Sequence, residues 1–224
     1  NLQIELLEGL GVWVERIDRN TCAFRADNID VDYLSSSSFR QKTGRLRGSV
    51  MLAGPLLARF KKAFIPKPGG DKIGRRRLDT NVIGFKKVGV QCDYDTDESF
   101  FHLHTSRIKG ATILLDEPSV TGTANLIMAA VLGDGITTLY NAACEPYIQQ
   151  LCKLLNKMGA KITGIASNML VIEGVSELYG TTHTILPDMI EVGSFIGLAA
   201  MTQRDILIKN AGLEHLGVIP ERFQ

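Results

Sequence analysis

Residues 155–162 read Leu-Asn-Lys-Met-Gly-Ala-Lys-Ile, and two earlier stretches of the chain follow the same pattern. Phe-Lys-Lys-Val-Gly-Val-Gln-Cys fills residues 85–92, and Leu-Glu-Gly-Leu-Gly-Val-Trp-Val fills residues 7–14. Each stretch combines the end of an amphipathic helix, a glycine that can adopt positive φ to end it, and the start of an alternating strand. The three glycines lie 78 and 70 residues apart, which indicates an internally repeated unit.

Each unit is predicted to run helix, hairpin, strand, helix, strand. The second copy supplies an apolar helix at 124–132 and a strand at 136–139, and the third a helix at 194–201 and a strand at 206–208. Each helix must bury its apolar stripe against neighbouring units, so the copies are expected to share a core. The predicted fold class is therefore α/β with mixed sheets. The chain opens directly in a helical pattern and stops inside another, so we expect it to be part of a longer polypeptide.

The composition favours a globular protein that does not cross a membrane. Hydrophobic residues make up 45% and charged residues 22% of the chain. The longest apolar stretch, 124–132, is shorter than the roughly 20 residues needed to span a bilayer. The four cysteines form no CxxC pair, which favours reduced core thiols and a cytoplasmic location. No cofactor is expected.

Positive charge is concentrated in residues 40–77, although the net charge is only +1. The single acid in this segment is Asp71, and such segregation favours a small multivalent anionic ligand. Two alternatives stay open, a solvated basic face and a non-catalytic module that binds RNA or another anionic polymer. Stacking on nucleic acid needs aromatic residues among the cations, and only Phe60 and Phe64 are available; no nucleic-acid partner is expected. The twelve cations of the segment are Arg40, Lys42, Arg45, Arg47, Arg59, Lys61, Lys62, Lys67, Lys72, Arg75, Arg76 and Arg77.

A glycine-rich loop lies inside the basic segment, with the sequence Pro-Lys-Pro-Gly-Gly-Asp-Lys-Ile-Gly at residues 66–74. Its glycines provide hinge points for a lid, and its amides could contact phosphate. The loop lacks the GxxxxGK[ST] pattern of a P-loop. It presents one acidic side chain, Asp71, near its tip.

Three further features have structural interpretations that we prefer. His102 and His104 lie two residues apart on an expected strand, but no third ligand has suitable spacing, so no metal site is predicted. Cys144 beside Glu145 is expected at a helix start, where the acid favours the helix dipole, rather than as a nucleophile. The serine run at 35–38 is expected to be a loop.

With these motifs assembled, the whole chain closely resembles the UDP-N-acetylglucosamine 1-carboxyvinyltransferase family and covers about half of that family's usual length. The resemblance implies an inside-out α/β barrel of repeated units in a two-domain enzyme. Residues 1–186 would form most of one domain, and residues 187–224 the crossover and the start of the second. The motifs that carry it are Arg-Gly-Ser at 47–49, residues 54–60, the loop at 68–74, residues 76–79, Ser119-Val120, Asn-Ala-Ala at 141–143 with Glu145-Pro146, and residues 186–191.

The resemblance implies transfer of the enolpyruvyl group of phosphoenolpyruvate to the 3-hydroxyl of UDP-N-acetylglucosamine, with release of phosphate, in peptidoglycan synthesis. Protonation of the methylene carbon needs a positioned acid, and the anionic groups need cations. Asp71 stands at the position of a reactive cysteine in many members and is the expected catalytic acid. The family's Lys-Asn pair would precede this segment and its aspartate base would follow it, so we expect residues 1–224 alone to be inactive. The expected substrate-binding residues are Arg47, Arg76, Arg77, Leu78, Asp79, Thr80, Ser119 and Val120.

Four departures from the family pattern matter. Asn81 stands where His is expected, Glu117 where many members have Lys, and Met189 where many have Arg; these affect details of nucleotide contact. Asp71 replaces a thiolate with a weak carboxylate nucleophile, so the full-length enzyme is expected to resist the epoxide fosfomycin. A related alternative is an enzyme resembling 5-enolpyruvylshikimate 3-phosphate synthase, which shares the fold and chemistry but uses another acceptor.

Overall fold

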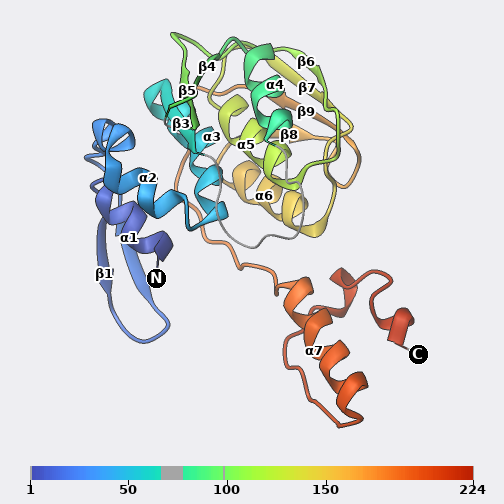
Figure 1. Ribbon diagram of the computed structural model, residues 1–224. Helices are drawn as coiled ribbons and strands as arrows, with labels where there is room; N and C mark the ends of the chain where they lie inside the picture. Colours follow the sequence, from blue (N-terminus) through green and yellow to red (C-terminus); the bar gives the residue numbers. More distant parts are fainter. Residues whose placement is uncertain (1, 67–77, 98, 224) are drawn as a thin grey trace. The chain divides into compact units, whose positions relative to one another are not determined.

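The computed structural model describes residues 2–66, 78–97 and 99–223 (Figure 1). The chain divides into two compact units, residues 1–179 and 180–224. A domain boundary at residues 186–187 stays a prediction. No helix in the described ranges is long and apolar enough to cross a membrane.

The first unit opens with helix α1 (Leu2–Gly9) and the hairpin of β1 (Trp13–Arg16) and β2 (Cys22–Arg25). A 3-10 helix, η1 (Val31–Ser35), then leads into α2 (Ser37–Thr43). The prediction of a loop at residues 35–38 is wrong, because these residues end η1 and begin α2. The hydroxyl of Ser36 accepts a hydrogen bond from the amide of Phe39 (3.1 Å) and begins α2 as its N-cap.

A second antiparallel sheet has the order β3-β5-β4, with β3 at Lys62–Pro66, β4 at Gln91–Asp95 and β5 at Phe100–His104. The 3-10 helix η2 (Arg47–Leu52) and helix α3 (Ala53–Phe60) precede β3, and α4 (Asp79–Lys87) precedes β4. Gly89 follows α4 with φ of +90°, and Gly159 ends the next amphipathic helix with φ of +102°, as their helix-ending role requires.

The third sheet has the order β6-β7-β9-β8 and is mixed. Strand β6 (Thr112–Leu114) pairs in parallel with β7 (Ile136–Tyr140), while β8 (Lys161–Thr163) and β9 (Met169–Glu173) complete it with antiparallel pairs. Helix α5 (Val120–Ala130) connects β6 to β7, and α6 (Pro146–Lys157) connects β7 to β8. From α4 to β7 the chain therefore runs helix, hairpin, strand, helix, strand, which confirms the predicted unit and the mixed sheets.

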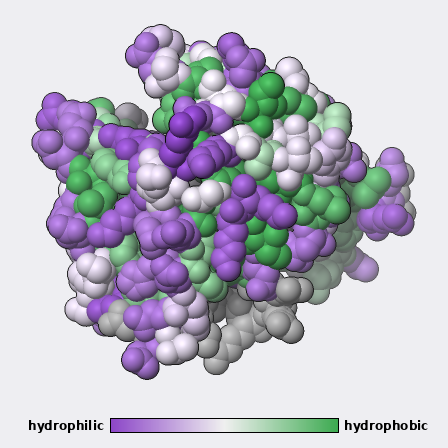
Figure 2. All heavy atoms as spheres, turned by 90° about the horizontal axis from the view of Figure 1, so that it is seen from above, coloured by the Kyte–Doolittle hydropathy of each residue, from purple (hydrophilic) through white to green (hydrophobic). Residues whose placement is uncertain are grey.

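Helix α5 lies in the interior of the first unit, with other helices and the sheets packed around it. Helix α5 packs against η2, α3, α4 and α6 (Figure 1), and residues 122–127 are all buried. The third sheet exposes Leu114, Ile136 and Tyr140 on its outer face. Figure 2 shows one face of the molecule, on which hydrophobic side chains are interspersed with hydrophilic ones. This arrangement agrees with the predicted inside-out packing of helices and sheets.

The second unit contains α7 (Met189–Thr202) and two 3-10 helices, η3 (Leu213–His215) and η4 (Pro220–Phe223). Asp188 caps α7, because its Oδ1 accepts from the amides of Ile190 (2.9 Å) and Glu191 (3.3 Å). The predicted helix at 194–201 is confirmed and is longer than expected. The predicted strand at 206–208 is wrong, since no described residue pairs with it in a ladder. The helix expected at the end of the sequence is a short 3-10 turn.

Candidate functional site

The expected substrate-binding residues that the structure describes belong to three segments. Arg47 is the first residue of η2, residues 78–80 begin α4, and residues 119–120 begin α5. Asp71, Arg76 and Arg77, together with the glycine-rich loop, lie outside the described residues. Their expected roles therefore stay predictions.

The structure places the first turns of α4 and α5 side by side. A Cβ atom built on Gly122 would lie 3.0 Å from Cγ2 of Thr80, and one built on Gly84 would lie 2.4 Å from Cδ1 of Leu126. The contact advances by four residues along each helix, so α4 and α5 run parallel and begin at the same end. Helix N-termini carry partial positive charge and backbone amides without partners inside the helix. Two such ends together favour an anionic ligand.

Side-chain hydrogen bonds fix this end of the helix pair. Thr80 is buried, and its hydroxyl donates to Oδ1 of Asp116 at 2.7 Å, which ties α4 to the loop before α5. Ser119 is the N-cap of α5, and its Oγ accepts from the amide of Gly122 at 3.2 Å. Oε1 of Glu117 lies 3.5 Å from the Thr80 hydroxyl. The Glu117 carboxylate thus lies beside the two helix ends.

A buried amide connects α4 and α5 to the segment that carries Arg47. Oδ1 of Asn125 accepts from the amide of Gly54 (2.9 Å), while its Nδ2 donates to the carbonyl of Val50 (3.0 Å) and to Oδ1 of Asn81 (2.9 Å). Asn81, which stands where the resemblance led us to expect His, is 1% exposed and belongs to this network. Asn125 was not predicted as a site residue, although a lone asparagine inside an apolar helix is a signal that can be read from sequence.

The basic segment does not form one cluster in its described part. Arg40 lies over the ring of Phe100, with 5.6 Å from Cζ to the ring centroid, and Lys62 lies 3.5 Å from Oδ1 of Asp32. Other cations bond to backbone carbonyls, namely Lys42 to Glu5, Arg59 to Ala26 and Lys61 to Ala58. The described cations of residues 40–62 therefore face different partners, and the anionic ligand expected for residues 40–77 stays a prediction, because the remaining cations of this segment lie outside the described residues.

The two strand histidines lie on one face of β5, as predicted. His104 pairs with Asp93 (Nδ1 to Oδ2, 3.7 Å) and His102 with Asp95 (Nε2 to Oδ2, 3.9 Å), while the His102 ring stacks on Phe100 at 4.7 Å between centroids. Across the described ranges no three His, Cys, Asp or Glu residues are grouped to hold a metal ion.

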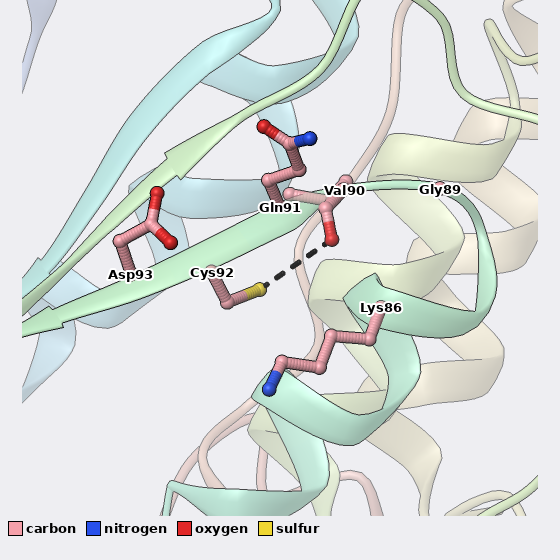
Figure 3. A pocket seen from close by; sticks show the side chains of 6 residues that line it. All are labelled: Lys86, Gly89, Val90, Gln91, Cys92 and Asp93. Atoms are coloured by element: carbon pink, nitrogen blue, oxygen red, sulfur yellow. Dashed lines mark hydrogen bonds between the residues drawn. The ribbon is translucent and has the colours of Figure 1, made fainter.

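The described part of the chain contains four free cysteines. Figure 3 shows Cys92 in an open pocket at the start of β4, with its Sγ directed at the carbonyl of Val90, 3.8 Å away. Burial raises the pKa of Cys92 to about 11, and it also raises that of Cys152 to about 11. Both thiols stay protonated near neutral pH, which suits core residues rather than nucleophiles. Cys144 is exposed just before α6, at the helix start predicted for it.

Comparisons with solved structures identify the fold. The enolpyruvyl transferase NikO from Streptomyces tendae superposes with a TM-score of 0.70 at 20% identity, covering 87% of this chain and 45% of that one. An EPSP synthase from Acinetobacter baumannii gives 0.66 at 14% identity, covering 89% and 44%. The sequence model of EPSP synthase (3-phosphoshikimate 1-carboxyvinyltransferase) matches residues 1–221, and the chain belongs to this family.

Among curated relatives, similarity is high to proteins named UDP-N-acetylglucosamine 1-carboxyvinyltransferase. Those of Bacteroides thetaiotaomicron and Bacteroides fragilis are each 59% identical over all 224 residues of this chain. That of Treponema denticola is 45% identical over 207 residues, which are 92% of this chain and 47% of the relative. The chain spans about half the length of these relatives, 52% for the Bacteroides proteins.

Proposed function

We propose that this chain is part of an enzyme that transfers the enolpyruvyl group of phosphoenolpyruvate to the 3-hydroxyl of UDP-N-acetylglucosamine. The observation that carries the proposal is 59% identity, over the whole chain, to proteins named for this reaction. The product would enter peptidoglycan synthesis in the cytoplasm, and so support cell shape and division. The remaining parts of the active site would come from other segments of the same polypeptide.

The paired ends of α4 and α5 support a role in holding the diphosphate of the sugar nucleotide. Both helices begin at the same end of their contact, and their dipoles favour negative charge there. Ser119, Val120 and residues 78–80 lie in these first turns. Arg47 would add a guanidinium group for the anionic substrates.

In the proposed reaction Asp71 delivers a proton to the methylene carbon of phosphoenolpyruvate. The sugar hydroxyl then bonds to the adjacent carbon as a base outside this segment takes its proton, which gives a tetrahedral intermediate. In the collapse of that intermediate, a base of the full-length enzyme takes one proton from the methyl group, the electrons of that C–H bond restore the double bond, and the C–O bond to phosphate breaks. The carboxyl must be protonated first, and nearby cations would oppose this. We propose that bound phosphates neutralise those cations and that loop closure desolvates Asp71.

The test is turnover by the full-length protein, measured as phosphate release and by mass spectrometry of the product. We expect release with phosphoenolpyruvate and UDP-N-acetylglucosamine, none with shikimate 3-phosphate, and loss of activity in Asp71→Asn. Product formation only with shikimate 3-phosphate would replace this function with the related one. Binding of an oligonucleotide in calorimetry, without binding of the sugar nucleotide, would favour the non-catalytic alternative.

A further inference from the structure

Asn125 uses all the hydrogen-bonding groups of its side chain except one lone pair, at a site that is 0% exposed. Backbone partners fix the orientation of its amide. The N–H of Gly54 can only donate and the carbonyl of Val50 can only accept, so Oδ1 must face Gly54 and Nδ2 must face Val50. The second Nδ2 hydrogen then requires an acceptor, which Oδ1 of Asn81 supplies.

Val50, Asn81 and Asn125 itself belong to the three segments that carry expected substrate-binding residues, and the fourth member of the network, Gly54, lies in α3. Val50 lies three residues after Arg47 in η2, and Asn81 directly follows Thr80 in the first turn of α4. Asn125 itself lies six residues after Ser119 on α5. The bonds to Val50, Asn81 and Gly54 link residues 75, 44 and 71 positions apart in sequence. One side chain therefore connects segments that no local interaction could align.

We propose that Asn125 is a positioning residue, whose amide holds the segments of Arg47, Thr80 and Ser119 in the register that the sugar nucleotide needs. The proposal rests on the proposed function. Asn125 follows the first turn of α5, and this role does not require that it touches the substrate itself. Small displacements of binding groups weaken catalysis strongly, because productive geometry tolerates little error.

An apolar side chain could not replace this amide without consequence. It would leave the amide of Gly54, the carbonyl of Val50 and Oδ1 of Asn81 buried without their partner, and buried polar groups without hydrogen bonds are strongly disfavoured. The backbones of α3 and α5 also touch here, since a Cβ on Gly54 would lie 2.4 Å from the carbonyl oxygen of Asn125. The helices can relieve the defect only by moving, and that movement would carry the substrate-binding segments with it.

The experiment measures KM for UDP-N-acetylglucosamine and the melting temperature of full-length variants. Asn125→Ala is expected to raise KM at least tenfold and to lower the melting temperature. The matched control is Ile162→Ala, which leaves a cavity at a buried residue of β8 that takes no part in the hydrogen bonds of Asn125. This variant is expected to lower the melting temperature while KM stays within twofold of wild type. A KM within twofold of wild type for Asn125→Ala, measured well below its melting temperature, would overturn the proposal.

A second pair of variants keeps the test decisive if Asn125→Ala fails to fold. Asn81→His and Asn81→Leu introduce side chains of similar size, but only neutral imidazole offers an acceptor to Nδ2 of Asn125. We expect the KM of Asn81→Leu to be at least fivefold higher than that of Asn81→His. Equal KM values for the two variants would refute the positioning role. Absence of turnover in the wild type would instead refute the proposed function.

Discussion

Gly54→Ala tests how closely the inner helices approach each other. Inside a helix, replacing glycine with alanine normally stabilises a protein by about 0.5–1 kcal/mol, because the unfolded chain loses conformational freedom. Gly54 is buried in α3, where an added Cβ would lie 2.4 Å from the carbonyl oxygen and 3.0 Å from Cα of Asn125. These neighbours are backbone atoms, so no side-chain rotation can relieve the overlap.

The expected result is net destabilisation. Ordinary van der Waals contacts lie near 3.5–4 Å, so α3 and α5 must separate by roughly an ångström. Overpacking of this kind typically costs about 1–3 kcal/mol. The separation also lengthens the Gly54–Asn125 hydrogen bond, and a typical bond contributes about 0.5–1.5 kcal/mol. Together these effects exceed the favourable helix propensity of alanine and leave a loss of about 1–3 kcal/mol.

Thermal unfolding of the full-length protein, followed by circular dichroism, measures the change. A loss of about 1–3 kcal/mol predicts a melting temperature lower by roughly 2–12 °C for a domain of this size. Gly180→Ala is the control, because none of the described residues places an atom within 4 Å of a Cβ added to Gly180. This variant is expected to leave the melting temperature unchanged or slightly higher. A Gly54→Ala protein as stable as wild type would refute the backbone contact between α3 and α5.

Three further predictions address single side chains. Thr80→Val removes the hydroxyl that donates to Asp116 and should destabilise the protein by about 1–3 kcal/mol, with weaker binding of the sugar nucleotide in calorimetry; Ser194→Ala, at an exposed site, should change neither. Asp71→Cys should make the full-length enzyme sensitive to fosfomycin, with a covalent adduct visible by mass spectrometry. Inhibition of the wild type by covalent attachment of fosfomycin to Asp71 would contradict the reasoning. Cys152 is buried and its thiol, with a pKa of about 11, is ionised in about one molecule per thousand at pH 8. Iodoacetamide should therefore alkylate the exposed Cys144 much faster than Cys152. Equal alkylation rates of the two cysteines in peptide mapping would count against this.

The repeat made the architecture predictable from sequence. Gly89 and Gly159 mark places where a helix must stop with positive φ, and only glycine adopts that geometry without strain. The alternating strand expected to start after Gly159 is β8, which begins at Lys161. Such signals are local, since a cap or an alternating strand needs only a few neighbouring residues.

Features that depend on distant partners could not be predicted. Residues 206–208 have the composition of a strand, but a strand also needs a neighbour to share its hydrogen bonds. Arg40 and Lys62 looked alike in a basic run, yet one lies over Phe100 and the other near Asp32. The prediction of a loop at 35–38 failed for a local reason. Ser36 is a good N-cap, and a serine run can begin a helix as well as interrupt one.

The corresponding helices of the other repeats have no amide side chain at the position of Asn125. The helices α3, α5 and α7 follow N-caps at Leu52, Ser119 and Asp188, and the residue six positions after each N-cap is Ala58, Asn125 and Ser194 respectively.

If a polar residue were needed at this position simply to build the repeated unit, all three copies would carry one with the same partners. Ala58 instead has no polar side chain, and the Ser194 hydroxyl donates to the carbonyl of Ile190 in its own helix (2.8 Å). The amide that links separate segments occurs only in the copy whose first turn carries Ser119 and Val120. The same kind of helix forms in the other copies without this amide, which supports the proposal that Asn125 serves positioning rather than the packing of the repeated unit.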